Sequence, residues 1–153
     1  MVQLVLPNDT NTMGNVLGGR VLHWIDLAAA IVAHRHCRSE TVTVSMDQVS
    51  FLAPIRVGQL AVIAARMTFV GKTSMEIRVD VQSEDLLNGD RRQTSTAYLT
   101  FVAVDKKGRP APVPRLLYKT REERREARAA EARRASRLAG RQAVPKSGEI
   151  QHR

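Results

Sequence analysis

The segment NTMGNVLGGRVLHWIDLAAAIVA, residues 11–33, constrains the fold of this chain more than any other. From Arg20 to about His36 the residues are apolar on more than one stripe, with alanines between larger aliphatic side chains, which predicts a largely enclosed helix. One carboxylate, Asp26, lies in the middle of this run, although an ionised Asp is costly to bury and lowers helix propensity. We therefore expect a specific reason for an acid at this position.

After this helix the sequence changes to the alternation that is typical of strands. The short segment VGKT, residues 70–73, predicts a hairpin, and residues 84–93 predict a polar loop. One helix followed by several strands in close succession predicts an α+β fold, in which a curved antiparallel sheet packs on the helix. The expected strands are residues 41–51, 59–69, 74–81 and 94–104.

Composition and charge divide the chain into a core and a tail. Its 153 residues suit one domain, and the PAPVP segment at residues 110–114 predicts the end of the fold. Residues 1–113 carry 12 basic and 10 acidic side chains, whereas residues 114–153 carry 12 basic and only 5 acidic side chains. The expected organisation is a globular domain over residues 1–118 and a basic tail over residues 119–153, which forms an exposed helix with disordered last residues.

The start of the chain, MVQLVLPNDT, lacks the pattern of a secretory signal, and no apolar run approaches the length of a membrane span. A single cysteine, Cys37, excludes an intrachain disulfide framework and fits a reducing compartment. Cytoplasmic localisation is the expectation. Aromatic residues make up only 4% of the chain, so no aromatic platform for nucleic-acid bases is predicted.

Asp26 is the first candidate catalytic residue. A structural interpretation pairs it with His23 one turn earlier or with a basic group elsewhere. However, Asp26 lies between Ile25 and Leu27 and is followed by three alanines, so no polar stripe continues past it. Since costly buried charges gather at functional sites, a functional role is favoured.

The loop before the helix supplies further candidates. Gly18 and Gly19 lie where unpaired backbone N–H groups and the positive end of the helix dipole can stabilise a negatively charged oxygen. Asn11 and Asn15 each offer an amide nearby, although Asn is also common in loops and caps. An acid, an amide and polarising N–H groups suit hydrolysis of a thioester, because a thiolate leaves without help from a general acid.

Other groups of residues are weaker candidates for a functional site. His34, His36 and Cys37 superficially resemble metal ligands, but residues two apart do not face each other on a helix, so we interpret them as helix-end residues and expect no metal. The serines form no GxSxG motif, and the chain has no phosphate-binding P-loop or dinucleotide GxGxxG motif.

Four segments together resemble the hotdog-fold acyl-CoA thioesterases of the cytosolic, brain-type group and their single-domain bacterial relatives. They are LPNDTNTMGNVLGGRVLHWID, VTVSMDQVSFLAPIRVGQ, RMTFVGKTSMEIRV and TAYLTFVAVDKKGRPAPVP, and the likeness covers about residues 4–118. The resemblance implies a long helix wrapped by a curved antiparallel sheet. It also implies a homodimer, often assembled into a trimer of dimers, with active sites at the dimer interface.

The resemblance further implies roles for individual residues. Asp26 would be the catalytic carboxylate, acting as general base on water or attacking the thioester directly. Asn11 of the other subunit would position the water or the substrate. N–H groups around Gly18 and Gly19 would hold the thioester oxygen. Coenzyme A would be part of the substrate, so no cofactor is implied; the candidate contacts to it are Lys72, Thr73 and Ser74 of the VGKTS turn and, more remotely, Arg56.

Two other functions stay open from the sequence. The basic tail could make the chain a non-catalytic module that binds acyl-CoA or nucleic acid, although its acidic residues and lack of an apolar face argue for a solvated appendage. A hotdog-fold dehydratase usually pairs the helix carboxylate with a catalytic His from another segment. The loop before this helix holds no His, and His23 lies on the helix itself.

Overall fold

A computed structural model describes residues 1–47 and 49–143 of the chain. It divides into two compact units, Met1–Leu116 and Leu117–Arg153. The first contains one long helix and six strands, and the second contains one helix. In chain order the elements are β1 (Val2–Leu4), the 3₁₀ helix η1 (Pro7–Asp9), α1 (Gly18–Cys37), β2 (Glu40–Met46), β3 (Ser50–Phe51), β4 (Leu60–Val70), β5 (Ser74–Glu84), β6 (Arg91–Val104) and α2 (Arg121–Ala143).

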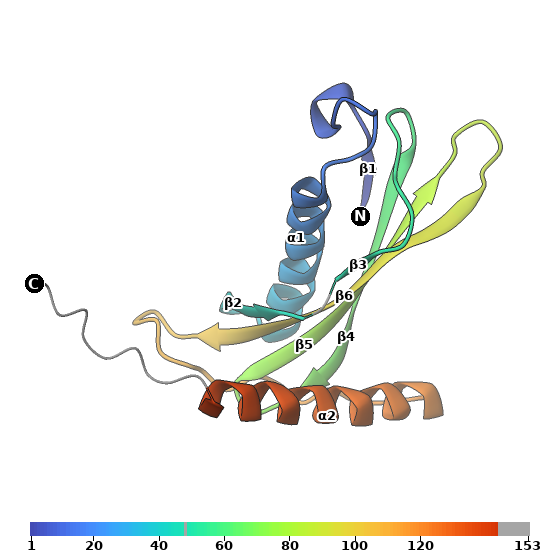
Figure 1. Ribbon diagram of the computed structural model, residues 1–153. Helices are drawn as coiled ribbons and strands as arrows, with labels where there is room; N and C mark the ends of the chain where they lie inside the picture. The colour runs from blue at the N-terminus through green and yellow to red at the C-terminus, as the bar shows by residue number, and fades with distance from the viewer. Residues whose placement is uncertain (48, 144–153) are drawn as a thin grey trace, which may run out of the picture. The chain divides into compact units, whose positions relative to one another are not determined.

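The first unit is an antiparallel sheet in the order β1-β4-β5-β6-β2, with β3 also paired to β6. Long strands β4, β5 and β6 curve around one side of α1 (Figure 1). The hairpin between β4 and β5 forms at the predicted VGKT segment, and its turn is held by a hydrogen bond from the Gly71 N–H to the Ser74 carbonyl (2.8 Å). The predicted α+β arrangement, a helix covered by a curved antiparallel sheet, is therefore confirmed.

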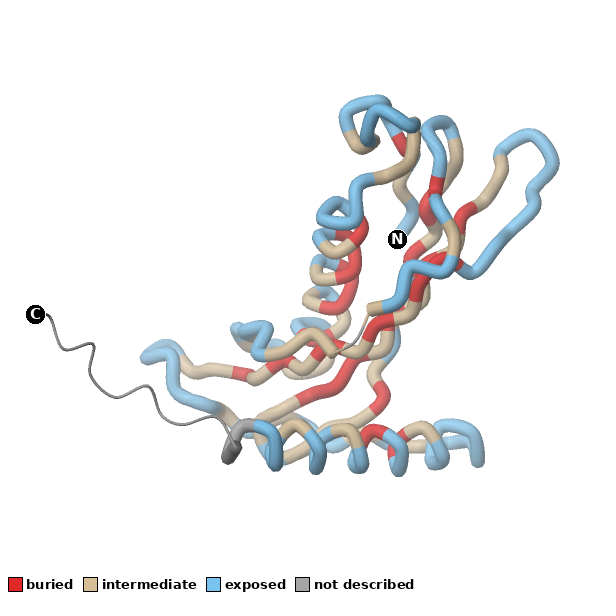
Figure 2. The backbone as a smooth tube through the Cα atoms, viewed as in Figure 1, coloured by how far each residue is buried: buried red, intermediate tan, exposed pale blue. Residues whose placement is uncertain are grey.

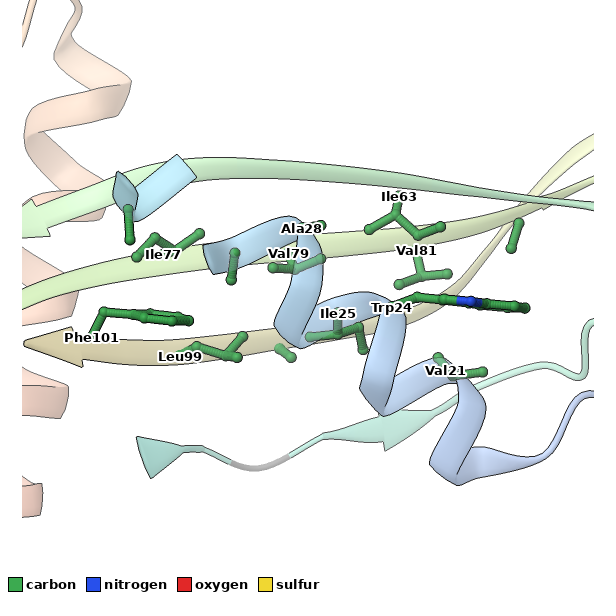
Figure 3. Packing of buried hydrophobic residues seen from close by; sticks show 14 of the residues in the cluster. Val21, Trp24, Ile25, Ala28, Ile63, Ile77, Val79, Val81, Leu99 and Phe101 are labelled. Atoms are coloured by element: carbon green, nitrogen blue, oxygen red, sulfur yellow. The ribbon is translucent and has the colours of Figure 1, made fainter. Parts of the chain in front are cut away.

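The core lies between α1 and the concave face of the sheet. Figure 3 shows Val21, Trp24, Ile25 and Ala28 of the helix against alternating side chains of the three long strands, among them Ile77 and Val79 of β5 and Leu99 and Phe101 of β6. Each of these strand residues is at most 1% exposed. Alternation along β5 and β6 thus selects the face that packs on the helix, as the period of two requires.

The helix is not enclosed on all sides within one chain, contrary to the prediction. Figure 2 shows buried residues along the sheet-facing side of α1 and half-buried or exposed residues along its other side. Leu27 and Ile31 are 42% and 40% exposed. The sheet of a single chain packs against only one face of α1. The apolar side chains on the other face are therefore not buried by residues of the same chain.

Strand boundaries differ from the predictions at several positions. The expected strand at residues 41–51 is divided into β2 and β3, β5 continues to Glu84 rather than ending at residue 81, and β6 begins at Arg91 rather than at Thr94. The predicted polar loop at residues 84–93 is therefore shortened to residues 85–90. The short N-terminal strand β1, which the sequence did not indicate, pairs with β4. In the PAPVP segment, the non-proline residues still donate to the sheet: the Ala111 N–H to the Ala103 carbonyl and the Val113 N–H to the Lys72 carbonyl.

In the second unit, α2 forms where the sequence predicts an exposed helix; most of its residues are exposed, whereas Ala127 and Ala130 are buried. It begins with a capping box, in which the Thr120 hydroxyl accepts from the Glu123 N–H (3.1 Å) and the Glu123 carboxylate accepts from the Thr120 N–H (3.0 Å). These backbone hydrogen bonds from Thr120 and Lys119 lower the pKa of Glu123. The predicted disorder of the last residues concerns positions 144–153, which lie outside the described part of the chain.

A charged network lies on the face of the sheet opposite the core. Asp80 of β5 accepts hydrogen bonds from Arg66, Arg78 and Thr96 at 2.7–3.1 Å. Burial raises the pKa of Asp80, but the hydrogen bonds from Arg78 and Thr96 and the charges of Arg78 and Arg66 more than offset it, so the pKa lies below its ordinary value of 3.8. The ionised form is therefore stabilised by folding.

We predict that Asp80→Asn lowers the free energy of unfolding at pH 7 by about 1 kcal/mol, because two guanidinium groups lose their counter-charge. Since the folded-state pKa is depressed, this contribution is present above pH 3.8 and is lost as the pH falls further. Urea unfolding of both proteins between pH 7 and pH 3 measures it. Glu40→Gln, whose side chain is 84% exposed, is the control; a pH-independent difference for Asp80→Asn would contradict the prediction.

Candidate active site

Asp26 is held by a side chain that carries no charge. It lies at the half-buried side of α1, and its Oδ1 accepts a hydrogen bond of 2.9 Å from the Thr43 hydroxyl of β2. Asp26 forms no ion pair with any residue that the structure describes, and the His23 side chain one turn earlier is exposed. The structural interpretation of Asp26 as half of a salt bridge is therefore wrong within one chain.

This arrangement leaves the second carboxylate oxygen of Asp26 available. A hydroxyl donor fixes the orientation of a carboxylate without neutralising it, because the proton stays on the hydroxyl oxygen. The free oxygen can accept a proton from water or attack an electrophile. Asp26 therefore has the chemistry of a general base or a nucleophile.

The loop before α1 is fastened at several points. Arg20 forms an ion pair with Asp9 (2.9 Å), and the Leu17 N–H donates to the Asp9 carbonyl (2.9 Å). Farther along the chain, the Val57 N–H donates to the carbonyl of Gly14, which adopts a φ of +75° that favours glycine. These contacts fix where α1 begins, at Gly18.

The first N–H groups of α1 have no acceptor. The N-cap residue, Leu17, has no side-chain oxygen with which to cap the helix, and the N–H groups of Gly18 and Gly19 make no hydrogen bond in the described structure. Both glycines are exposed. The predicted position of these two residues at the helix start is confirmed, and their N–H groups are free to bind an oxygen that carries negative charge.

Asn11 presents its amino group rather than its carbonyl. Its Oδ1 accepts hydrogen bonds from the Met13 N–H (3.0 Å) and the Asn15 N–H (3.1 Å). Since backbone N–H groups only donate, these contacts assign the amide orientation. The Nδ2 group has no partner among the described residues, so Asn11 can act toward a ligand as a hydrogen-bond donor.

Asp26 and the free N–H groups of the same chain do not converge. Gly18 and Asp26 are eight residues apart on one helix, which is about 12 Å along its axis. Moreover, the N–H bonds at a helix N-terminus point away from the helix body, so an oxygen bound there lies farther still from Asp26. One chain thus supplies the parts of a site without bringing them together.

The candidate coenzyme A contacts also lie apart. Lys72, Thr73 and Ser74 lie at the β4–β5 turn, where the backbone carbonyls of Lys72 and Thr73 accept from Val113 and Ala103. Arg56 lies in the segment between β3 and β4, opposite Asn15 of the loop before α1. The two groups are near opposite ends of β5, and they are not brought together within one chain.

His34, His36 and Cys37 lie in the last turn of α1, as predicted. The His34 ring is 2.9 Å from the Ala30 carbonyl, the His36 ring is 2.8 Å from the Pro114 carbonyl, and the Cys37 thiol contacts Ser39. Over residues 1–47 and 49–143, no group of three His, Cys, Asp or Glu side chains could hold a metal ion.

In the same ranges, no helix combines the length and the apolar character that crossing a membrane requires.

Thr43 is the site residue that the sequence did not indicate. In TVTVSM, Thr41 and Thr43 occupy equivalent alternate positions, and nothing in the pattern distinguishes them. The structure separates them, since Thr43 reaches Asp26 whereas Thr41 reaches His34. A register shift in the β2–β6 pairing directly follows Thr43.

Comparisons with known proteins identify the family. The thioesterase superfamily model matches residues 13–89, a range that includes the loop before α1, Asp26 and Thr43. The chain belongs to the thioesterase superfamily. It is a thioester hydrolase with the hotdog fold, as the sequence resemblance predicted.

Two relatives show how much of the chain this superfamily membership covers. An acyl-CoA thioester hydrolase of Bacillus subtilis, described as uncharacterised, is 47% identical over 119 residues, which are 78% of this chain and 69% of that protein. The cytosolic acyl coenzyme A thioester hydrolase of Rattus norvegicus is 36% identical over 127 residues, 82% of this chain. This chain spans only a third of the length of the rat protein.

Solved structures of superfamily members match the fold along nearly the whole chain. A hexameric acyl-CoA thioesterase superposes with a TM-score of 0.87 and 42% identity over 95% of this chain and 92% of the other. The acyl-CoA hydrolase of Staphylococcus aureus has been solved in complex with butyryl coenzyme A, coenzyme A and coenzyme A disulfide. It superposes with a TM-score of 0.85 and 33% identity, covering 97% of this chain and 93% of the other.

The Staphylococcus aureus hydrolase has also been solved as three single alanine variants. The replaced residues are an asparagine, an aspartate and a threonine at its positions 28, 43 and 60. The intervals, 15 and 17 residues, equal those from Asn11 to Asp26 and from Asp26 to Thr43 in this chain.

We predict that Thr43→Val lowers kcat for a thioester about 10- to 100-fold, because Asp26 loses the donor that orients it. Thr43→Ser, which keeps the hydroxyl, should restore most of the activity. Thr41→Val, two residues earlier on β2, is the matched control and should leave kcat unchanged. Steady-state kinetics with detection of the released thiol measure all three; equal losses in the Val and Ser variants would contradict a role for the hydroxyl.

Proposed function

We propose that this thioesterase hydrolyses acyl-CoA to a free fatty acid and coenzyme A. The observation that carries the proposal is the Asp26 carboxylate, which has one oxygen bonded to Thr43 and the other unoccupied, without a cationic partner among the described residues. The names of the relatives and the coenzyme A complexes of the Staphylococcus aureus hydrolase support acyl-CoA as the substrate class.

In the proposed reaction, Asp26 takes a proton from water as the water oxygen attacks the thioester carbon. Alternatively, the Asp26 carboxylate attacks that carbon itself, and water then hydrolyses the mixed anhydride left on Asp26 to the free acid and the regenerated carboxylate. Negative charge then develops on the carbonyl oxygen, where the Gly18 and Gly19 N–H groups and the Asn11 amino group can donate hydrogen bonds. The C–S bond breaks and the electron pair leaves with sulfur as a thiolate. Since a thiolate is a stable leaving group near neutral pH, the site needs no general acid.

We propose that each site is completed by a second copy of the chain. The catalytic base must lie within hydrogen-bond distance of the attacking water, and that water must lie in contact with the thioester carbonyl carbon. Within one chain, about 12 Å of helix separates Gly18 from Asp26. Asn11 and the helix start of one copy must therefore meet Asp26 and Thr43 of the other.

An exposed apolar surface supports this pairing. Large apolar side chains on α1, β2, β3 and the residue after β3 are between 36% and 68% exposed, and β2 is an edge strand of the sheet. A surface of this kind is expected to be covered by a partner. Its members are Leu27, Ile31, Val42, Val44, Phe51 and Leu52.

A homodimer formed in this way is the proposed basic unit. Relatives from Yersinia pestis and an acyl-coenzyme A thioesterase named HI0827 are described as hexameric, which supports a trimer of dimers. Coenzyme A enters as part of the substrate, so the proposal includes no resident cofactor and no metal. We propose the cytoplasm as the location, in keeping with the cytosolic mammalian relatives.

Asp26→Asn tests the proposal directly. The amide cannot accept the proton from water, so we expect kcat with acetyl-CoA or a longer acyl-CoA to fall about 100- to 10,000-fold. Size-exclusion chromatography and the unfolding midpoint should be unchanged, since Asn can still accept from Thr43. Asp105→Asn, at a half-buried position in the turn after β6, is the control; near-normal turnover by Asp26→Asn would contradict the assignment.

A further inference from the structure

A mostly apolar cavity lies beside the start of α1. Its volume is about 380 Å³, and its wall is formed by the beginning of α1, by β3 with the residues that follow it, and by β6. Gly18, whose N–H group is free to bind the thioester oxygen in the proposed reaction, is one of the lining residues. A group attached to a thioester bound at Gly18 can therefore enter this cavity.

Ser95 of β6 places a hydroxyl in the wall of the cavity. It is directly opposite Val81 of β5 and Phe51 of β3, and opposed residues of a sheet point to the same face. Val81 lies on the face that packs on α1 (Figure 3). Thr94, one residue before Ser95, has no opposite residue on β5 because the pairing is shifted there. Such bulges direct side chains toward functional sites in many sheets.

The Ser95 hydroxyl has no hydrogen-bond partner among the described residues, although Ser95 is 0% exposed. By contrast, the Thr94 hydroxyl donates to the Val81 carbonyl (2.9 Å). The buried hydroxyls of Ser45 and Thr100 also have no partner in the described part of the chain, but neither residue lines this cavity. Burying a hydroxyl without a partner costs free energy, which a polar atom of a ligand in the cavity would recover.

The chemistry of the wall favours the acyl group over the pantetheine arm as the occupant. The pantetheine arm carries amides, each with a donor and an acceptor that need partners, whereas the wall offers a single unpartnered hydroxyl. An aliphatic chain needs no polar partner, and one oxygen substituent on it would match the Ser95 hydroxyl. Since a cavity of ~150 Å³ accommodates a benzene ring, this cavity has room for a short acyl chain.

The second copy of the proposed dimer would close this cavity. Phe51 and Leu52, which line it, are 54% and 68% exposed and belong to the apolar surface that the partner is proposed to cover. Closure excludes water from the acyl group. A hydrogen bond from Ser95 then contributes more to binding, because water cannot replace it.

We propose that this cavity binds the acyl group and that the Ser95 hydroxyl selects acyl groups with a hydroxyl or keto oxygen near the thioester. The position of the oxygen follows from the cavity, since Gly18 and Ser95 line the same small space. The inference rests on the proposed acyl-CoA hydrolysis and names the substrate class within it. Ser95 determines specificity and takes no part in the chemical step.

The test compares butyryl-CoA with 2-hydroxybutyryl-, 3-hydroxybutyryl- and acetoacetyl-CoA. For the wild-type protein, we expect kcat/KM to be about 3- to 10-fold higher for at least one oxygenated substrate than for butyryl-CoA, which is the effect of one neutral hydrogen bond. Ser95→Ala should lose this preference without a loss of activity toward butyryl-CoA. Ser45→Ala removes an equally unpartnered hydroxyl outside the cavity, so this matched control should keep the preference.

Three results would overturn the inference. A wild-type protein without any preference for oxygenated acyl groups has no such selectivity. Equal losses for butyryl-CoA and its oxygenated derivatives in Ser95→Ala would mean that the hydroxyl contacts a part that all four substrates share, such as the pantetheine arm. A clear fall in the unfolding midpoint of Ser95→Ala would mean that the hydroxyl is bonded within the fold, since removal of an unpartnered group should not destabilise it.

Calorimetry with thioether analogues separates this inference from the proposed activity. S-butyl-CoA and its 2-hydroxybutyl and 3-hydroxybutyl counterparts have no carbonyl group, so they cannot be hydrolysed. We expect the wild-type protein to bind a hydroxylated analogue at least about threefold more tightly than S-butyl-CoA, and Ser95→Ala to bind them equally. If this difference is found but no acyl-CoA is hydrolysed, the proposed activity fails while the selectivity of the cavity stands. If acyl-CoA is hydrolysed but wild-type binding and turnover ignore the oxygen, only the present inference fails.

Discussion

The rigid geometry of α1 is the constraint on which the proposed site depends. A helix has a fixed rise per residue, so the positions of Gly18 and Asp26 in the sequence set their separation at about 12 Å. Nothing in the sheet can shorten this distance, because the buried side of α1 is packed against it from Val21 to Ala33. The donors and the base of one reaction must then belong to two helices. The exposed side of α1, with Leu27 and Ile31, is available for the second one.

The partners of two carboxylates explain why one is structural and the other is a candidate catalyst. Asp80 is surrounded by Arg66, Arg78 and Thr96, which use its oxygens and lower its pKa. Asp26 receives a single hydrogen bond from a neutral hydroxyl. The oxygens of Asp80 are occupied by contacts within the sheet, from its own strand and from both neighbouring strands, whereas one oxygen of Asp26 stays open to a substrate. The exposure of Asp26 between two copies also answers why a carboxylate persists in an apolar helix: in the proposed dimer it faces a site rather than a core.

Local signals in the sequence predicted most of the fold, and they failed where long-range contacts decide the structure. The helix, the long strands and the VGKT hairpin follow from periodicity and turn residues. The exposure of Leu27 does not, because apolarity alone cannot distinguish contact with the chain's own sheet from contact with a second copy. Thr43 was missed for a similar reason, since strand register decides which of two threonines faces α1.

Mixing two inactive variants tests the two-chain site most directly. Asp26→Asn and Asn11→Ala chains each lack one part of every site in their homo-oligomers. When they are unfolded and refolded together, a mixed dimer holds one site with both substitutions and one site with neither. The account predicts that the mixture recovers roughly a quarter of wild-type acyl-CoA hydrolysis, as random pairing gives half mixed dimers with one intact site each. A mixture that exchanges subunits but stays as inactive as its components would contradict it, because both residues would then act within a single chain.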